Sequence, residues 1–113
     1  MTLVLVIDID GAVDQRGLER LRTHLNLRSR GRLTDDWDQK FGTRDVQTAN
    51  GQATSITLFR NFDETWKVQV SDTRDDMPGA DEIATIQAEL VEGITAAGFH
   101  ATVRPKPTFG PRA

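Results

Sequence analysis

The chain has 113 residues, of which 37% are hydrophobic and 27% are charged, with a formal net charge of −3 and no cysteine. This length and composition are typical of one folded domain and exclude a largely disordered chain. The lack of cysteine excludes disulfides and thiolate metal sites, so we expect a cytoplasmic protein. Because Asp8 and Asp10 interrupt the first apolar run, and no basic segment precedes it, we expect neither a signal peptide nor a membrane span.

The first predicted element is a central strand over Thr2–Asp10. Leu or Ile occupies every odd position from 3 to 9 and Val occupies positions 4 and 6, so both faces of this strand are apolar over most of its length. Such a strand needs cover on both sides and belongs inside a sheet. It leaves the core at two carboxylates, Asp8 and Asp10, followed by Gly11.

A helix is predicted next, over residues 15–28, with Asp14 as its N-cap. Leu18, Leu21 and Leu25 have the spacing of one buried stripe on this helix.

Basic residues are concentrated in and after this helix. Residues 15–32 hold six arginines and one acid, whereas the segments before and after are acidic. Arg16 and Arg20 are four residues apart on the polar face, and Arg28 extends the same row. This polarity indicates either a charged partner or a solvated helix face.

A second, shorter helix is predicted from Thr34 to Gly42. Trp37 and Phe41, four residues apart, form its apolar edge. They would cover a sheet face that the longer helices leave open, and this is the interpretation we favour. The alternative is that they anchor a partner protein, because aromatic residues are enriched at such anchors.

Three antiparallel strands are predicted in the middle of the chain. Asn50-Gly51 is typical of a type I′ hairpin turn and would join a short strand at 44–48 to a longer one at 53–60. After a second turn at 61–64, residues 65–71 alternate between apolar and polar side chains.

The most regular helical pattern covers residues 81–97. Gly93 lowers the helix propensity there by about 1 kcal/mol relative to Ala, which indicates a close packing approach. A short strand at 99–104 completes a domain over 1–104. The prolines of residues 105–113 predict an extended tail.

The order of these elements reduces to β-α-β-β-α-β, the ferredoxin-like order, with one short extra helix and one extra hairpin strand. We therefore predict an α+β fold with the helices mainly on one face of a mixed sheet. In this interpretation the first strand and the strand at 65–71 are parallel neighbours. Asp8 and Asp10 would then face Asp72, Asp75 and Asp76, and converging carboxylate oxygens suit Mg²⁺ or Ca²⁺.

Residues 6–13, VIDIDGAV, resemble the first motif of the haloacid dehalogenase-like phosphatases, a hydrophobic strand followed by Asp-x-Asp-Gly. That family has a doubly wound core and uses Mg²⁺. The resemblance implies that Asp8 is a phosphoryl-accepting nucleophile and Asp10 a general acid/base. It also implies that Asp72 or Asp76 is the carboxylate on the metal side. The function in this alternative is Mg²⁺-dependent phosphoryl transfer.

We favour a different function, a small non-enzymatic binding protein without a cofactor, such as an immunity-type inhibitor, an antitoxin or a regulatory subunit. A compact acidic domain with polarised charge suits contact with another protein. Nucleic acid is a weaker candidate, because no aromatic residue interleaves the arginines, and a homodimer is a further possibility. The candidate partner-binding residues are Arg16, Arg20, Arg28, Trp37 and Phe41.

Overall fold

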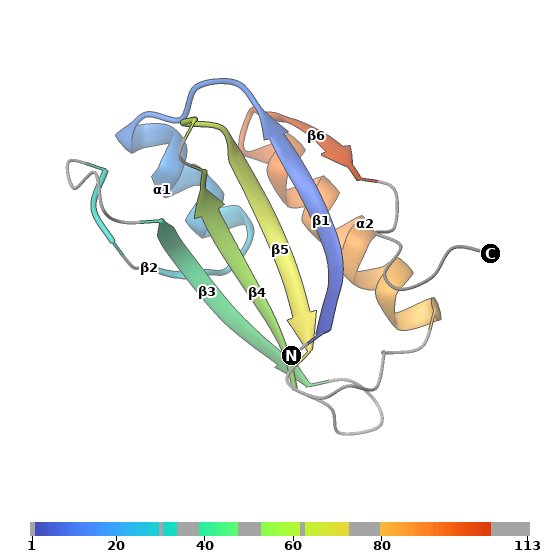
Figure 1. Cartoon of the computed structure of the whole chain (residues 1–113). Coiled ribbons are helices and arrows are strands. Elements are labelled where there is room, and N and C mark those ends of the chain that lie inside the picture. Colours follow the sequence, from blue (N-terminus) through green and yellow to red (C-terminus); the bar gives the residue numbers. More distant parts are fainter. Residues whose placement is uncertain are drawn as a thin grey trace.

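The structure, a computed structural model, describes residues 2–29, 31–33, 39–47, 53–61, 63–72 and 80–104. These residues form an α+β fold with a six-stranded sheet and two helices, and both helices lie on one face of the sheet (Figure 1). The elements are β1 (Thr2–Asp10), α1 (Gln15–His24), β2 (Arg28–Ser29), β3 (Lys40–Gln47), β4 (Ala53–Arg60), β5 (Trp66–Asp72), α2 (Ala80–Ala96) and β6 (His100–Val103).

The strand order is β2-β3-β4-β5-β1-β6, and every neighbouring pair is antiparallel. The prediction of a mixed sheet with β1 and β5 parallel is therefore wrong. β1 and β4 do run in the same direction, but β5 lies between them. β5 and β6 also run in the same direction, with β1 between them. The helical connection from β5 through α2 to β6 thus skips one strand, β1, which runs the opposite way. The connection from β1 through α1 enters β2 at the far edge of the sheet, and the chain reaches β4 only after β2 and β3.

The core lies between the sheet and the helices. β1 directs Leu5, Ile7 and Ile9 into it, and the alternation predicted for β5 is confirmed. From the helices come Leu18, Leu21, Leu25, Ile86, Leu90 and Ile94. On the other face of β1, Val6 is also buried, whereas Asp10 is exposed, so the strand is interior as predicted and polar at its end.

The first helix is shorter than predicted. Asp14 caps it as expected, accepting a hydrogen bond from the Gly17 amide at 2.7 Å. The helix ends at His24, because Asn26 takes a left-handed conformation with φ of 55° and turns the chain back toward the sheet. Arg28 therefore lies in the short edge strand β2 and does not extend the row of Arg16 and Arg20.

The predicted second helix is wrong where the structure describes it. Residues 40–42 belong to β3, which pairs with β4 along its length, and pairing in the sheet outweighs the local helix signals. A bulge between Lys40 and Gly42 turns Phe41 into the core, where its ring centroid lies 5.0 Å from that of Trp66. Thr34–Asp38, with Trp37, and the Asn50-Gly51 turn lie outside the described residues.

The second helix of the structure packs closely on the first. A Cβ added at Gly93 would lie 2.7 Å from Leu25 Cδ2 and 3.0 Å from the His24 carbonyl oxygen, which confirms the predicted close approach. Gly98, with φ of 94°, then turns the chain into β6. Within the described residues neither helix is long and apolar enough to cross a membrane. The predicted tail at 105–113 lies outside them.

Candidate functional site

The sheet surface opposite the helices, which we call the open face, carries the candidate site. Cross-strand pairing places one residue from each of five strands in a single row across it, namely Lys40, Phe59, Lys67, Asp8 and Thr102. A second row holds Arg28, Thr43, Thr57, Gln69 and Val6, and among the other described residues on this face are Asp10, His100, Asp45, Ser55 and Arg104. Because strand side chains alternate, these residues point away from the core.

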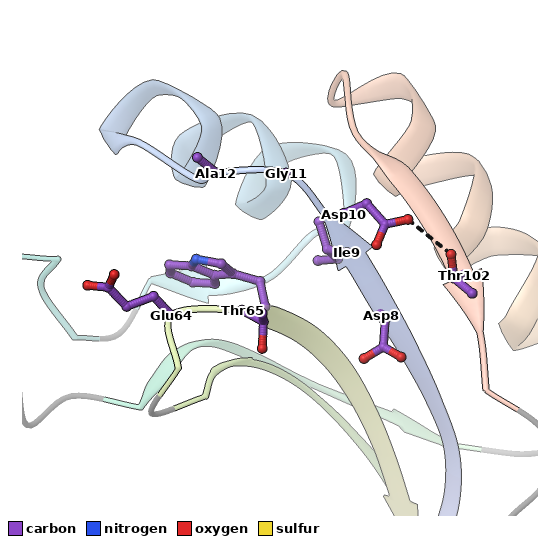
Figure 2. A pocket seen from close by; sticks show the side chains of 9 residues that line it. Asp8, Ile9, Asp10, Gly11, Ala12, Glu64, Thr65 and Thr102 are labelled. Atoms are coloured by element: carbon purple, nitrogen blue, oxygen red, sulfur yellow. Dashed lines mark hydrogen bonds between the residues drawn. The ribbon is translucent and has the colours of Figure 1, made fainter.

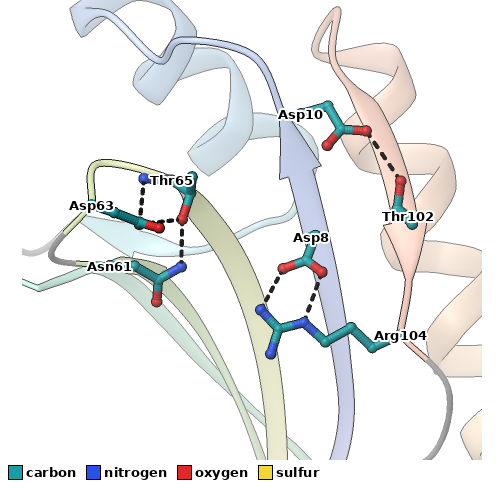
Figure 3. A network of polar contacts seen from close by, with 7 residues as sticks. All are labelled: Asp8, Asp10, Asn61, Asp63, Thr65, Thr102 and Arg104. Atoms are coloured by element: carbon teal, nitrogen blue, oxygen red, sulfur yellow. Dashed lines mark hydrogen bonds and ion pairs between the residues drawn. The ribbon is translucent and has the colours of Figure 1, made fainter.

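Asp8 forms a two-point ion pair with Arg104, just beyond β6. Arg104 Nε donates to Asp8 Oδ2 at 2.7 Å, and Arg104 Nη2 donates to Asp8 Oδ1 at 2.8 Å (Figure 3). The hydrogen bond with Asp8 raises the pKa of Arg104. Both carboxylate oxygens of Asp8 are therefore already engaged by a fixed cation.

Asp10 is held by β6 in a similar way. His100 Nδ1 lies 2.9 Å from Asp10 Oδ2, and the Thr102 hydroxyl donates to the same oxygen at 3.1 Å. The hydrogen bond with His100, and to a smaller extent that with Thr102, holds the pKa of Asp10 below its ordinary value. The two carboxylates of the Asp-x-Asp-Gly motif thus fasten β1 to the neighbouring edge strand.

A cavity of about 570 Å³ opens where β1 ends and β5 begins (Figure 2). One wall comes from the turn before β5, where Asp63 accepts hydrogen bonds from both the amide and the hydroxyl of Thr65 (Figure 3). Asn61 Nδ2 also donates to the Thr65 hydroxyl, at 2.9 Å. The lining residues are Asp8, Ile9, Asp10, Gly11, Ala12, Glu64, Thr65, Trp66 and Thr102. Three of these residues are carboxylates, and Arg104 pairs with one of them, Asp8.

The predicted convergence of Asp72 on Asp8 and Asp10 is wrong. In the antiparallel register Asp72 pairs with Thr2, whereas Asp8 pairs with Lys67, so the two acids are separated by about 20 Å along the strands. Asp75 and Asp76 lie outside the described residues. Within those residues no group of three or more Asp, Glu, His or Cys side chains is placed to hold a metal ion.

The residues that the structure describes also do not fit Mg²⁺ at the motif. Asp8 has no oxygen left without a guanidinium partner, and the antiparallel sheet differs from the doubly wound core that the phosphatase resemblance implies. No catalytic step is therefore assigned to Asp8 or Asp10.

The four predicted partner-binding residues that the structure describes do not form one surface, and the fifth, Trp37, lies outside the described residues. Arg16 is exposed on α1, and Arg20 donates from Nε to the Ala97 carbonyl at 2.9 Å near the end of α2. Arg28 lies on the open face, 3.8 Å from Asp45. Phe41 is fully buried, which contradicts its role as an exposed anchor.

Sequence reasoning missed the cluster of Lys40, Phe59 and Lys67. The Nζ atoms of Lys40 and Lys67 lie 5.9 and 5.7 Å from the centroid of the Phe59 ring. A signal was present, because Phe59 falls in the polar phase of the strand at 53–60, alternating with the buried Ile56 and Leu58.

Compared with family models, curated proteins and solved structures, the chain has no match. Its function must therefore be inferred from the chemistry of the open face. That face combines acidic, basic and aromatic side chains on one side of an α+β domain.

Proposed function

We propose that this protein is a non-enzymatic binding protein that acts by protein–protein contact through its open face, in the manner of an immunity-type inhibitor, an antitoxin or a regulatory subunit. The observation that carries this proposal is the mixed charge of that face. Asp8, Asp10 and Asp45 lie on it together with Lys40 and Lys67. A phosphate backbone offers only negative charge, whereas a protein partner can match both signs.

The engagement of the motif carboxylates supports binding over catalysis. A nucleophilic carboxylate needs an open approach and a metal to neutralise the attacked phosphate. Asp8 is instead held at two points by Arg104. The ion pair fixes side chains on the open face and so preorganises it for a partner.

A ferredoxin-like unit is the architecture that we propose for this binding protein. Its strands are β1, β4, β5 and β6, and β2 and β3 extend it at one edge. The support is that β5 and β6, which α2 joins, run in one direction with antiparallel β1 between them, the split β-α-β arrangement. β1 and β4 also run in one direction with antiparallel β5 between them, and the connection between these two strands contains α1, β2 and β3. The proposed location is the cytoplasm, which the lack of cysteine favours.

Site-specific photo-crosslinking in the source cells tests the function. A photoreactive phenylalanine analogue replaces Thr57, in the middle of the open face, or as a control Glu92, which is exposed on α2. We expect one identified foreign protein to be linked through position 57 and not through position 92. Linkage through position 92 alone would contradict the proposal. Linkage at position 57 to a second copy of this chain would show that the open face forms a homodimer and does not bind a foreign protein.

A further inference from the structure

We propose that Lys40, Phe59 and Lys67, the lysine–phenylalanine cluster, bind the carboxylate of an acidic side chain in the partner protein. This inference rests on the proposed function and deepens it. It names the anchor point on the open face and the chemistry of the group that docks there.

The cluster combines one apolar ring with two cations. Lys40 and Lys67 are the cross-strand neighbours of Phe59 on either side, and their Nζ atoms lie 5.9 and 5.7 Å from its centroid. Contact with the ring attracts both ammonium groups and keeps them close to its surface. A carboxylate above this site would meet two cations, and the methylene groups that carry it would lie on the ring.

The two lysines differ from the other charged residues of the open face. Asp8 is paired with Arg104, Asp10 with His100 and Asp45 with Arg28. Lys67 is the cross-strand neighbour of Asp8, yet Arg104 engages both oxygens of that carboxylate. Within the described part of the chain neither lysine forms an ion pair, so no described acid neutralises these two positive charges.

The surroundings favour a protein carboxylate over single-stranded nucleic acid. Sheet surfaces that read RNA stack two or three bases on several aromatic rings, whereas this cluster has one ring. Asp8, in the strand beside the cluster, and Asp45, further along the strand of Lys40, lie on the same face and offer no contact to the phosphates of neighbouring nucleotides. A single acidic side chain of a protein can bind the cluster without bringing further negative charges along the rest of the face.

Peptide titration followed by amide NMR shifts tests the inference. The probe is a ten-residue Gly/Ser peptide with Glu-Phe-Glu at its centre, and its matched control carries Gln-Phe-Gln. We expect saturable shifts centred on residues 40, 59 and 67 with the first peptide, and binding about tenfold weaker with the second. The double variant Lys40→Gln/Lys67→Gln should lose about tenfold in affinity for the Glu peptide.

A charge-matched variant separates the site from general electrostatics. Gln15→Glu/Ala88→Glu changes the net charge by the same amount at exposed helix positions, and it should bind the Glu peptide within about twofold of wild type. Equal losses in the two double variants, equal binding of the two peptides, or no saturable binding would overturn the inference. So would tighter binding of a fifteen-nucleotide oligo-dT at the cluster. If the peptide fails while crosslinking through position 57 persists, the inference falls and the proposed function stands.

Discussion

At the scale of single residues, Thr54 combines full burial with an unsatisfied hydroxyl. Its side chain is 0% exposed, and within the described residues Oγ1 has no hydrogen-bond partner. A buried polar group without a partner keeps its desolvation cost, and an apolar group of the same shape removes it. We expect Thr54→Val to raise the free energy of unfolding, measured with urea, by about 1 kcal/mol.

A matched substitution on the open face provides the control. Thr57→Val makes the same chemical change in the same strand at a partly exposed site, so it should alter the free energy of unfolding by less than about 0.5 kcal/mol. If Thr54→Val is no more stable than wild type, the hydroxyl has a partner in solution, for example a buried water.

The carboxyl group of Asp10 makes the free energy of unfolding depend on pH. Its pKa in the folded protein is lowered by His100 and Thr102, so its contribution to stability is present above the unfolded value of about 3.9. That contribution is lost as the pH falls through the lower folded pKa. We expect Asp10→Asn to reduce the difference in unfolding free energy between neutral pH and about pH 3. Thr102→Val should reduce it less, and an unchanged difference in Asp10→Asn would refute the coupling.

At the scale of elements, the contact between α1 and α2 depends on Gly93. Alanine has the better helix propensity by about 1 kcal/mol, but its Cβ would meet Leu25 Cδ2 at 2.7 Å and the His24 carbonyl at 3.0 Å. Overpacking of this kind costs about 1–3 kcal/mol, so we expect Gly93→Ala to destabilise the protein by about 1 kcal/mol. Urea unfolding measures this, with the exposed Glu92→Ala as a near-neutral control. A more stable Gly93→Ala variant would show that the helices can separate at no cost.

The elements were predictable where local pattern and tertiary environment agree. Residues 65–71 and 81–97 have an apolar period that matches their buried faces, and both were predicted within a residue or two. Phe41 shows the opposite case, because capping residues before it favour a helix while pairing with β4 makes it part of a strand. The two-residue strand β2 has no pattern of its own, since only its position beside β3 defines it.

At the scale of the whole molecule, strand direction was what the sequence could not supply. Alternation shows which side chains share a face, but it is the same for parallel and antiparallel neighbours. The exposure of Asp10 at the end of β1 was therefore predictable, whereas the residues that lie beside the β1 carboxylates on the adjacent strands were not. Arg104 and Lys67, rather than Asp72, lie beside Asp8 because β5 and β6 both run against β1.

This topology leads to a prediction about Mg²⁺. A hard divalent ion needs several converging oxygen ligands, and the antiparallel register separates Asp72 from Asp8 while Arg104 occupies both oxygens of Asp8. We expect millimolar Mg²⁺ to cause no saturable amide shifts at residues 8–11, and Asp8→Asn to respond as wild type does. Saturable shifts that disappear in Asp8→Asn would contradict this, because the ion would have to displace Arg104. The variant Arg104→Gln tells whether Mg²⁺ is excluded by the guanidinium of Arg104 or by the lack of converging oxygen ligands. If the guanidinium excludes the ion, weak Mg²⁺ binding should be measured only in this variant.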